Sequence, residues 1–251
     1  MTRKSSWEDE YYDYGVPTEP ASSVVPLREN DRGGLDVYLT RRQRNLSFMG
    51  GFFVFPGGKV DDADYDERIV SRCAGLNPAN AAKILGGGID PYPAIGYWVA
   101  GIRELFEEAG VLLAYNAYGI MPDFDNTAAR ARYDSYRDDI HTGKMEFAEL
   151  LEKEDLRPAT DRLLYLSHWI TPPGAPRRFD TRFFLSLVPT GQHPRYFEAE
   201  ISEGFWMPVE EAIQKAQKGD LRMILPTFMC LKEALDYSSG EEILRACREY
   251  Y

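Results

Sequence analysis

Three glutamates close together in the sequence are the residues most able to do chemistry. Glu104, Glu107 and Glu108 are spaced i, i+3 and i+4, so a helix would place all three carboxylates on one face. Like charges at this spacing repel one another, and a hard divalent cation with oxygen ligands would offset that repulsion. Arg103 could tie down one carboxylate or the preceding loop. Because glutamates on a helix are usually solvated, the spacing alone is weak support for a metal site.

The segment that carries these glutamates has the apolar spacing of a helix over residues 94–109. Six apolar residues recur there every three or four positions: Ile95, Trp98, Val99, Ile102, Leu105 and Phe106. Gly110 is well placed to end the helix, because glycine tolerates the left-handed conformation of a helix C-terminus. The sequence therefore predicts a helix that is buried on one side and acidic on the other.

Other segments must form the scaffold that positions this helix. Alternating or continuous apolar runs predict strands at 23–28, 35–40, 52–55, 163–169 and 183–188. Helices are predicted within 66–85 and at 128–140, 146–153, 210–218, 226–237 and 241–250. Early strands, one central helix, later strands and terminal helices favour an α+β or α/β sandwich over a helical bundle.

The composition excludes several classes of protein. Hydrophobic residues make up 44% of the 251 residues, enough for a sizeable core, and the net charge of −11 argues against binding to nucleic acid. No apolar run approaches the roughly 18 residues of a membrane span, so no membrane partner is expected. Three cysteines without a C-x-x-C pair argue against a zinc cluster or a disulfide framework and predict a cytoplasmic location. Residues 1–21 show no apolar period, which predicts a flexible N-terminal tail.

With two upstream glycines, the acidic helix resembles the signature of the Nudix hydrolase family, G-x5-E-x7-R-E-U-x-E-E-x-G-U, where U is aliphatic. Its second half matches at every fixed position from Arg103 to Val111. In the first half, Gly58 would be the signature glycine, and Asp64 stands where the pattern has Glu. Gly58 and Arg103 are 45 residues apart, so 31 residues are inserted relative to the pattern. We expect this insertion to leave the metal helix intact and to reshape the rim of the site.

Segments outside the signature resemble the coenzyme A diphosphatase branch of this family, which also carries a long insertion inside the signature. The upstream match is partial, because Gln43 and Ser47 stand where the branch has Ser and Arg. The matching segments are Leu39–Arg42, Gly51–Gly58, Trp169–Pro172, Arg177–Phe184 and Trp206–Pro208. The resemblance implies a Nudix α/β/α sandwich with a mixed sheet over residues 22–251. It further implies helical insertions at about 65–93 and 116–160, the second of which could form a lid, a dimer contact or both.

The resemblance also implies an activity: Mg²⁺- or Mn²⁺-dependent hydrolysis of a nucleoside diphosphate derivative, preferentially coenzyme A or acyl-coenzyme A. ADP-ribose, NADH or a dinucleoside polyphosphate are alternative substrates, and a nucleotide-sensing module without hydrolysis is an alternative function. The partner would be a small nucleotide diphosphate, and a homodimer is possible. The implied metal ligands are Glu104, Glu107 and Glu108. The implied catalytic residues are Glu107, Glu108, Arg103 and Glu200, with Glu203 as an alternative to Glu200. The predicted substrate-binding residues are Arg42, Arg44, Gly57, Gly58 and Arg178. The arginines are chosen because guanidinium matches phosphate geometry. As alternatives, Arg42 and Arg44 could lie at a solvated hairpin end, and Arg178 could pair with acidic residues.

Overall fold

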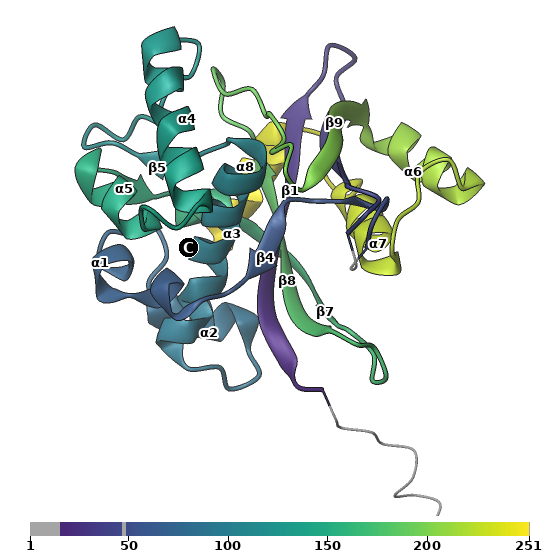
Figure 1. Cartoon of the computed structure of the whole chain (residues 1–251), viewed down its shortest axis with the longest axis horizontal. Helices are drawn as coiled ribbons and strands as arrows, with labels where there is room; N and C mark the ends of the chain where they lie inside the picture. Colours follow the sequence, from purple (N-terminus) through teal and green to yellow (C-terminus); the bar gives the residue numbers. More distant parts are fainter. Residues whose placement is uncertain (1–15, 47–48, 251) are drawn as a thin grey trace, which may run out of the picture.

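A mixed β-sheet forms the centre of the molecule (Figure 1). The computed structural model describes residues 16–46 and 49–250. The strand order is β3-β2-β1-β8-β7, with β9 paired to β2 and β4 paired to β1. β1 and β8 run parallel, whereas the other named pairs of this sheet are antiparallel. The strands are β1 (Thr18–Glu29), β2 (Leu35–Arg42), β3 (Phe53–Val54), β4 (Gly57–Lys59), β7 (Leu164–Ile170), β8 (Arg178–Leu187) and β9 (Ile201–Pro208).

The longest strand, β1, begins inside the segment that we predicted to be a tail. Thr18 already pairs with Arg178, and the parallel ladder with β8 continues to Leu27. Residues 18–21 are therefore ordered by backbone hydrogen bonds to a strand about 160 positions later, which no local pattern could indicate. The boundary at residue 21 was wrong in this respect, and residues 1–15 of the predicted tail lie outside the described residues. The predicted strand at 52–55 is also shorter, because only Phe53–Val54 pair with β2.

Side chains that alternate along the strands divide the interior into two cores. Val24 and Phe184 belong to the core beneath α3 (Pro91–Ala109), whereas Val25 and Leu185 belong to the core on the opposite face. The second core is covered by α6 (Val209–Lys218), α7 (Leu225–Ala234) and α8 (Gly240–Tyr250). Because successive side chains of a strand point to opposite faces, a sheet with both faces apolar needs helices on both sides. The predicted α/β/α sandwich with a mixed sheet is thus confirmed.

The central helix α3 follows the predicted pattern and starts three residues earlier than expected. Pro91 occupies its first turn, where a missing N–H costs nothing. Its residues Trp98, Ile102 and Leu105 are fully buried. Gly110 ends the helix in the left-handed conformation, with φ 67°. The helix therefore packs a rigid apolar face on the sheet, and its glutamates lie on the side that faces β4.

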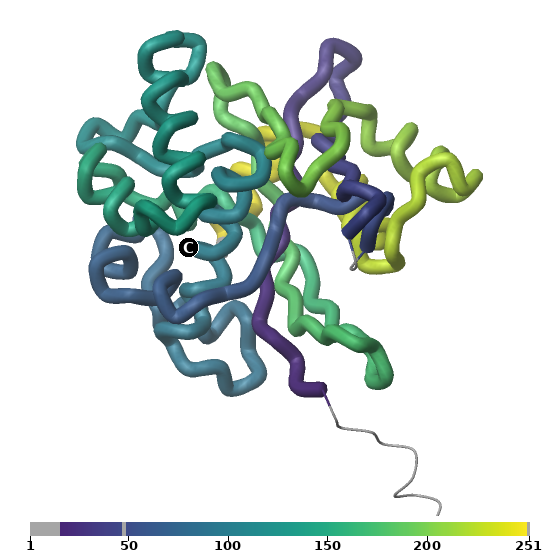
Figure 2. Tube along the Cα trace, viewed as in Figure 1, coloured from purple at the N-terminus to yellow at the C-terminus, as the bar shows by residue number. Residues whose placement is uncertain are grey.

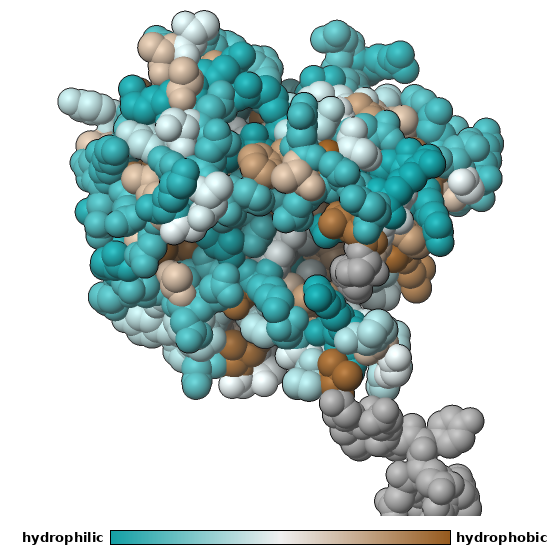
Figure 3. Space-filling model, viewed as in Figure 1, coloured by the Kyte–Doolittle hydropathy of each residue, from teal (hydrophilic) through white to brown (hydrophobic). Residues whose placement is uncertain are grey.

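The two insertions form one helical layer over the outer side of α3. The first follows the short η1 (Asp62–Tyr65) and holds α1 (Glu67–Val70) and α2 (Pro78–Leu85). The second holds α4 (Thr127–His141) and α5 (Phe147–Lys153). It lies between β5 (Ala114–Tyr115) and β6 (Arg157–Pro158), and the short η2 (Thr160–Arg162) follows. Arg68 of the first insertion pairs with Glu146 of the second at 2.7 Å. Figure 2 shows these segments side by side, and Figure 3 shows that their surface is mostly hydrophilic.

This placement corrects one expectation about the first insertion. Residues 65–93 pack behind α3 and contribute none of the described residues that line the central cavity. The insertion therefore does not reshape the rim of the site. A different segment does so, since His141 at the end of α4 reaches that cavity. No described helix is both long and apolar enough to cross a membrane.

Candidate active site

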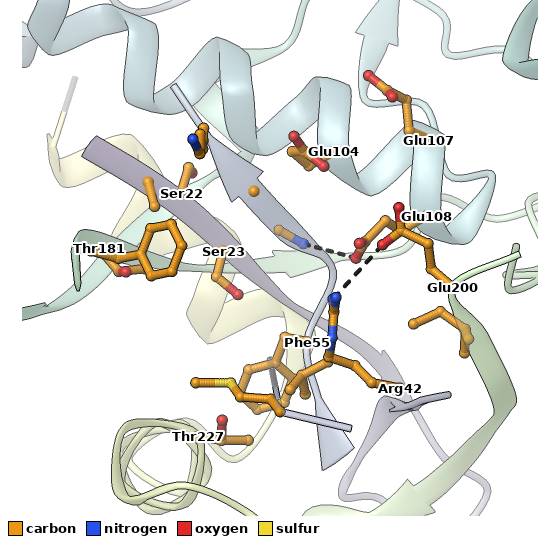
Figure 4. Close-up of a pocket in the computed structure, with 18 of the residues that line it drawn as sticks. Ser22, Ser23, Arg42, Phe55, Glu104, Glu107, Glu108, Thr181, Glu200 and Thr227 are labelled. Carbon is orange, nitrogen blue, oxygen red and sulfur yellow. Dashed lines mark hydrogen bonds and ion pairs between the residues drawn. The ribbon is translucent and has the colours of Figure 1, made fainter. Parts of the chain in front are cut away.

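A cavity of about 450 Å³ lies beside α3, where β1 changes its partner along one edge. Residues 21–23 of β1 pair with β4, whereas residues 27–29 pair with β2. The divergence of β4 and β2 leaves a space that side chains from several elements line (Figure 4). They include Ser22, Ser23, Arg42, Phe55, Gly57, Gly58, Lys59, Glu104, Glu107, Glu108, His141, Arg177, Phe179, Thr181, Phe183, Phe197, Glu200, Ile224 and Thr227.

The three glutamates of α3 all line this cavity, but their surroundings differ. Glu104 and Glu107 both accept hydrogen bonds from Nη1 of Arg103, at 2.8 and 3.0 Å. Oε2 of Glu108 accepts a bond of 3.1 Å from the backbone N–H of Gly57. Burial raises the pKa of Glu104 to about 7, and the carboxylate of Glu107 adds to this rise. Burial likewise raises the pKa of Glu108 to about 8, with a further contribution from Glu104.

Two glycines let the β4 backbone approach these carboxylates closely. A Cβ atom on Gly58 would lie 2.3 Å from Oε1 of Glu104, well inside van der Waals contact. A Cβ atom on Gly57 would lie 2.4 Å from the backbone oxygen of Ser22 on β1. Gly57 is therefore required for pairing of β4 with β1, and Gly58 for the position of the Glu104 carboxylate. The two predicted glycines are brought into the site, in different roles.

Arg103 is held by the residue that stands where the signature has Glu. Asp64 is buried, with 1% of its side chain exposed, and accepts bonds of 2.7 and 2.9 Å from Nε and Nη2 of Arg103. The Lys59 carbonyl accepts a further bond from Nη2. Burial raises the pKa of Asp64, although the bonds from Arg103 oppose that rise. The shorter Asp64 side chain thus suffices to anchor Arg103, which in turn orients Glu104 and Glu107.

The donor set suits a hard divalent cation, although no cluster is preformed. Among the residues that the structure describes, no group of three His, Cys, Asp or Glu side chains is arranged to hold a metal ion. Arg103 engages Glu104 and Glu107 instead, while Glu108 accepts a hydrogen bond from the Gly57 N–H. Carboxylate oxygens are nevertheless the ligands that Mg²⁺ and similar ions prefer. A cation would also offset the cost of ionising the buried Glu104 and Glu108, so the residues fit such a group.

A fourth glutamate reaches the cavity from the segment before β9. Glu200 lies opposite Glu108, and Figure 4 shows the two carboxylates pointing toward each other beside Arg42. Nη1 of Arg42 lies 3.8 Å from Oε2 of Glu200. The alternative residue, Glu203, instead pairs with Arg41 at 2.8 Å and does not line the cavity. Of the two glutamates singled out near Trp206, the structure therefore brings only Glu200 to the site.

Two of the predicted substrate-binding arginines lie elsewhere. Arg44 is exposed and does not line the cavity. Arg178 donates hydrogen bonds to the carbonyls of Thr171 and Val16, which fasten the β7–β8 hairpin and the start of β1. Its neighbour Arg177 lines the cavity instead. Strand alternation explains the difference, because residues 177, 179, 181 and 183 face the cavity while the even-numbered ones face away. That period of two was the signal that could have identified Arg177.

Two aromatic residues at the rim had no signal in the sequence. The rings of His141 and Phe197 pack with their centroids 4.0 Å apart, and both line the cavity. They are 56 positions apart and come from α4 and the loop before β9. Part of the lining is apolar, and we call Phe55, Phe183 and Ile224 the apolar floor of the cavity. The cavity thus has an acidic wall, several cationic side chains and an apolar floor.

Comparisons with known proteins agree with this architecture. The sequence profile of the NUDT19 Nudix domain matches residues 77–233. The human acyl-coenzyme A diphosphatase NUDT19 is 26% identical over 261 residues, covering 92% of this chain and 68% of the human protein. The Xenopus laevis protein of the same name is 22% identical over 247 residues, covering 87% of this chain and 64% of its own length. This chain therefore spans about two thirds of the length of these relatives.

A solved structure supports the same assignment. The crystal structure of a Nudix hydrolase from Alicyclobacillus acidocaldarius superposes with a TM-score of 0.73 and 25% sequence identity. The match covers 92% of this chain and 97% of that one. Nudix hydrolases generally use divalent metal ions, which agrees with the carboxylate wall of the cavity. Because the family profile covers more than half of the sequence, this chain belongs to the Nudix hydrolase family, within the NUDT19 branch.

Proposed function

We propose that this protein is a divalent-metal-dependent hydrolase that cleaves the diphosphate bond of coenzyme A or an acyl-coenzyme A. The products would be 3′,5′-ADP and a phosphopantetheine. The observation that carries the proposal is the convergence of four carboxylates on one cavity that also holds cationic side chains and an apolar floor. The NUDT19 relatives are acyl-coenzyme A diphosphatases by name, which supports the choice of substrate.

The acidic wall is the proposed metal site. Glu104, Glu107 and Glu108 would hold Mg²⁺ or Mn²⁺ through carboxylate oxygens. When bound, such a cation supplies the positive charge that offsets both the buried carboxylates and the diphosphate of the substrate. Arg103, which is anchored by its ion pair with Asp64, orients Glu104 and Glu107 through hydrogen bonds. The Gly57 N–H holds one oxygen of Glu108 in place, which limits the rotation of that side chain.

The other polar residues of the cavity have proposed roles toward the substrate. Glu200 is 42% exposed, so water reaches its carboxylate, which can accept a proton from an attacking water molecule. Arg42 lies beside it and offers a guanidinium that matches phosphate geometry. Arg177 and Lys59 add positive charge along the same cavity. Together they offset part of the protein's net negative charge where an anionic substrate would bind.

The apolar floor favours coenzyme A thioesters over the alternative substrates. Phe55, Phe183 and Ile224 offer apolar surface against which the chain of an acyl-coenzyme A could bury its methylene groups. Ser23 and Thr227 line the same cavity and could bind the amide and hydroxyl groups of pantetheine.

The three cysteines are free, and the proposal places the protein in the cytoplasm. A homodimer is a further part of the proposal, to be tested by light scattering.

The proposal is tested by identifying products by mass spectrometry. The protein is incubated with Mg²⁺ or Mn²⁺ and coenzyme A, acetyl-coenzyme A, NADH, ADP-ribose and diadenosine polyphosphates. Release of 3′,5′-ADP from the coenzyme A species alone supports the proposal. Cleavage of another compound supports the metal site on α3 but rejects coenzyme A as the substrate. Binding without cleavage would assign the protein to the nucleotide-sensing class. Glu108→Gln serves as the inactive control, and Glu211→Gln on α6 as a matched exposed glutamate.

A further inference from the structure

A buried arginine of the second insertion contacts the end of the helix that carries the glutamates. Arg137 lies on α4, with 6% of its surface exposed. Its Nε donates a hydrogen bond of 2.7 Å to the backbone oxygen of Glu107. A Cβ atom on Gly110 would lie 3.2 Å from its Nη1, so the guanidinium packs directly on the helix end. α4 and the last turn of α3 therefore meet through this side chain.

The last turn of α3 needs partners, because its final carbonyl groups have none within the helix. Local bonds close the end of the helix: the Gly110 N–H binds the Phe106 oxygen, and the Val111 N–H binds the Leu105 oxygen. Two further bonds come from distant segments. Arg137 binds the Glu107 oxygen, and the backbone N–H of Arg195 binds the Ala109 oxygen at 2.8 Å. Two long-range contacts thus fix the turn that carries Glu107 and Glu108.

The charge of Arg137 is unusual for a buried group. Among the described residues no carboxylate forms an ion pair with it, and its Nη2 has no hydrogen-bond partner. Burying a charge without a counter-ion is costly, and burial lowers the pKa of this guanidinium. The charge faces the carbonyl end of α3, where a positive charge is favourable, and the ring of Phe197, 5.5 Å from Cζ. Asp134 and Asp138 on the same helix also favour the charged form of Arg137, whereas the charge of Arg195 opposes it.

The same guanidinium also borders the segment that delivers the fourth glutamate. Phe197 lies three residues before Glu200 and packs against His141 at the end of α4. Arg137 consequently lies between the last turn of α3 and the segment from 195 to 200. A change at this position would shift Glu107 and Glu108 relative to Glu200 without touching any of their side chains.

From these contacts we infer that Arg137 is a positioning residue for the site. It sets the last turn of α3 against the segment that carries Glu200, and so makes the second insertion part of the catalytic apparatus. Nothing in the family signature includes this position, since it lies 26 residues beyond Val111. The inference rests on the proposed function where it is tested by metal binding. Where it is tested by amide hydrogen exchange, it rests on the fold alone.

The experiment compares Arg137→Met and Arg137→Lys with a matched control, Arg130→Met. Arg130 lies on the same helix and donates from Nε to the Phe124 oxygen at 2.8 Å, and it forms no hydrogen bond or ion pair with the described residues of α3. Mn²⁺ binding to the full chain is measured by electron paramagnetic resonance. Amide hydrogen exchange of residues 105–111 is measured without metal or substrate. Thermal unfolding of each variant establishes that it is folded.

We expect Arg137→Met to weaken Mn²⁺ binding by about 10- to 100-fold, as for other groups that orient metal ligands. We also expect faster exchange at the Gly110 and Val111 amides, whereas Arg130→Met leaves both readouts at wild-type values. Arg137→Lys keeps the charge and the aliphatic stem but lacks the Nε–H, so faster exchange is expected there too.

Two results would overturn the inference. One is wild-type Mn²⁺ affinity and exchange in a folded Arg137→Met variant, or in Arg137→Lys if the methionine variant does not fold. The other is an equal loss in Arg130→Met. If the wild-type protein itself fails to bind Mn²⁺, the proposed function is rejected, and amide exchange still decides the role of Arg137.

Discussion

Gly58→Ala is the substitution for which the structure makes the sharpest prediction. The new methyl group would lie 2.3 Å from Oε1, 2.5 Å from Cδ and 2.8 Å from Oε2 of Glu104. Ordinary contact begins at 3.4 Å, so the carboxylate must retreat by about 1 Å. The φ angle of Gly58 is not positive, so alanine can adopt the same backbone conformation. The change therefore acts on Glu104 and leaves the β4 backbone unstrained.

The expected cost follows from that displacement. A shift of 1 Å in a reacting or coordinating group lowers the rate by about 100-fold, which corresponds to roughly 2.7 kcal/mol of transition-state stabilisation. Glu104 has little room to adapt, because its side chain is 15% exposed and is bonded to Arg103 at 2.8 Å. We expect kcat/KM to fall by about this factor while the thermal unfolding temperature stays near that of the wild type.

Two further glycines serve as controls for this experiment. A Cβ atom on Gly34 meets no atom closer than 3.7 Å, so Gly34→Ala should leave activity unchanged. A Cβ atom on Gly57 would meet the Ser22 backbone at 2.4 Å, so Gly57→Ala should lower stability as well as activity. Wild-type kcat/KM in a folded Gly58→Ala variant would refute the reasoning, since Glu104 would then not need its observed position.

Three other predictions concern the buried charges. Glu108→Gln keeps an oxygen for the Gly57 N–H but removes the negative charge. Metal-dependent turnover, measured by product release, should therefore be lost. The metal-free variant should be more stable than the metal-free wild type at pH 8.5, as measured by thermal unfolding. The metal-free protein should lose stability as pH rises from 4.5 to about 8, because Glu104 and Glu108 keep their protons in the folded state to about 7 and about 8, whereas the unfolded chain releases them near 4.5. Each of the two carboxyl groups lowers the free energy of unfolding by up to about 1.4 kcal/mol per pH unit in this range, which calorimetry would detect. Saturating Mg²⁺ should reduce this loss of stability. Asp64→Asn should lower the free energy of unfolding by about 3 kcal/mol in urea titrations, since it removes one partner of the buried Arg103.

Each of these predictions has a result that contradicts it. Undiminished turnover in Glu108→Gln would remove this residue from the proposed metal site. A metal-free protein whose stability rises between pH 5 and 8 would show that Glu104 and Glu108 are ionised without cost. Asp31→Asn, in an exposed turn, is the matched control for Asp64→Asn, and equal stabilities of the two variants would show that the bond to Arg103 is not needed.

Much of the local structure was predictable because its cause is local. The period of apolar residues in 94–109 and the capping Gly110 predicted α3 with an error of three residues at its start. The terminal helices were predicted within a few residues for the same reason. The beginning of β1 was missed, since residues 18–21 are ordered by the distant strand β8 rather than by their own pattern.

The site was predictable to the extent that its residues share one helix. The spacing of Glu104, Glu107 and Glu108 places them on one face whatever surrounds them, because 3.6 residues make one turn. The sequence by itself also determined that a glycine pair precedes this helix and that an arginine adjoins the acidic face. Those features follow from short-range geometry and suffice to indicate the family.

Tertiary structure alone decided which distant residues complete the site. Glu200 and Arg42 meet across 158 positions, and Arg177 rather than Arg178 faces the cavity because of the strand's orientation in the sheet. The first insertion packs behind α3, whereas the second reaches the rim and contacts the last turn through Arg137. Long-range packing depends on the summed burial of many side chains on both faces of a sheet, and no window of the sequence contains that sum.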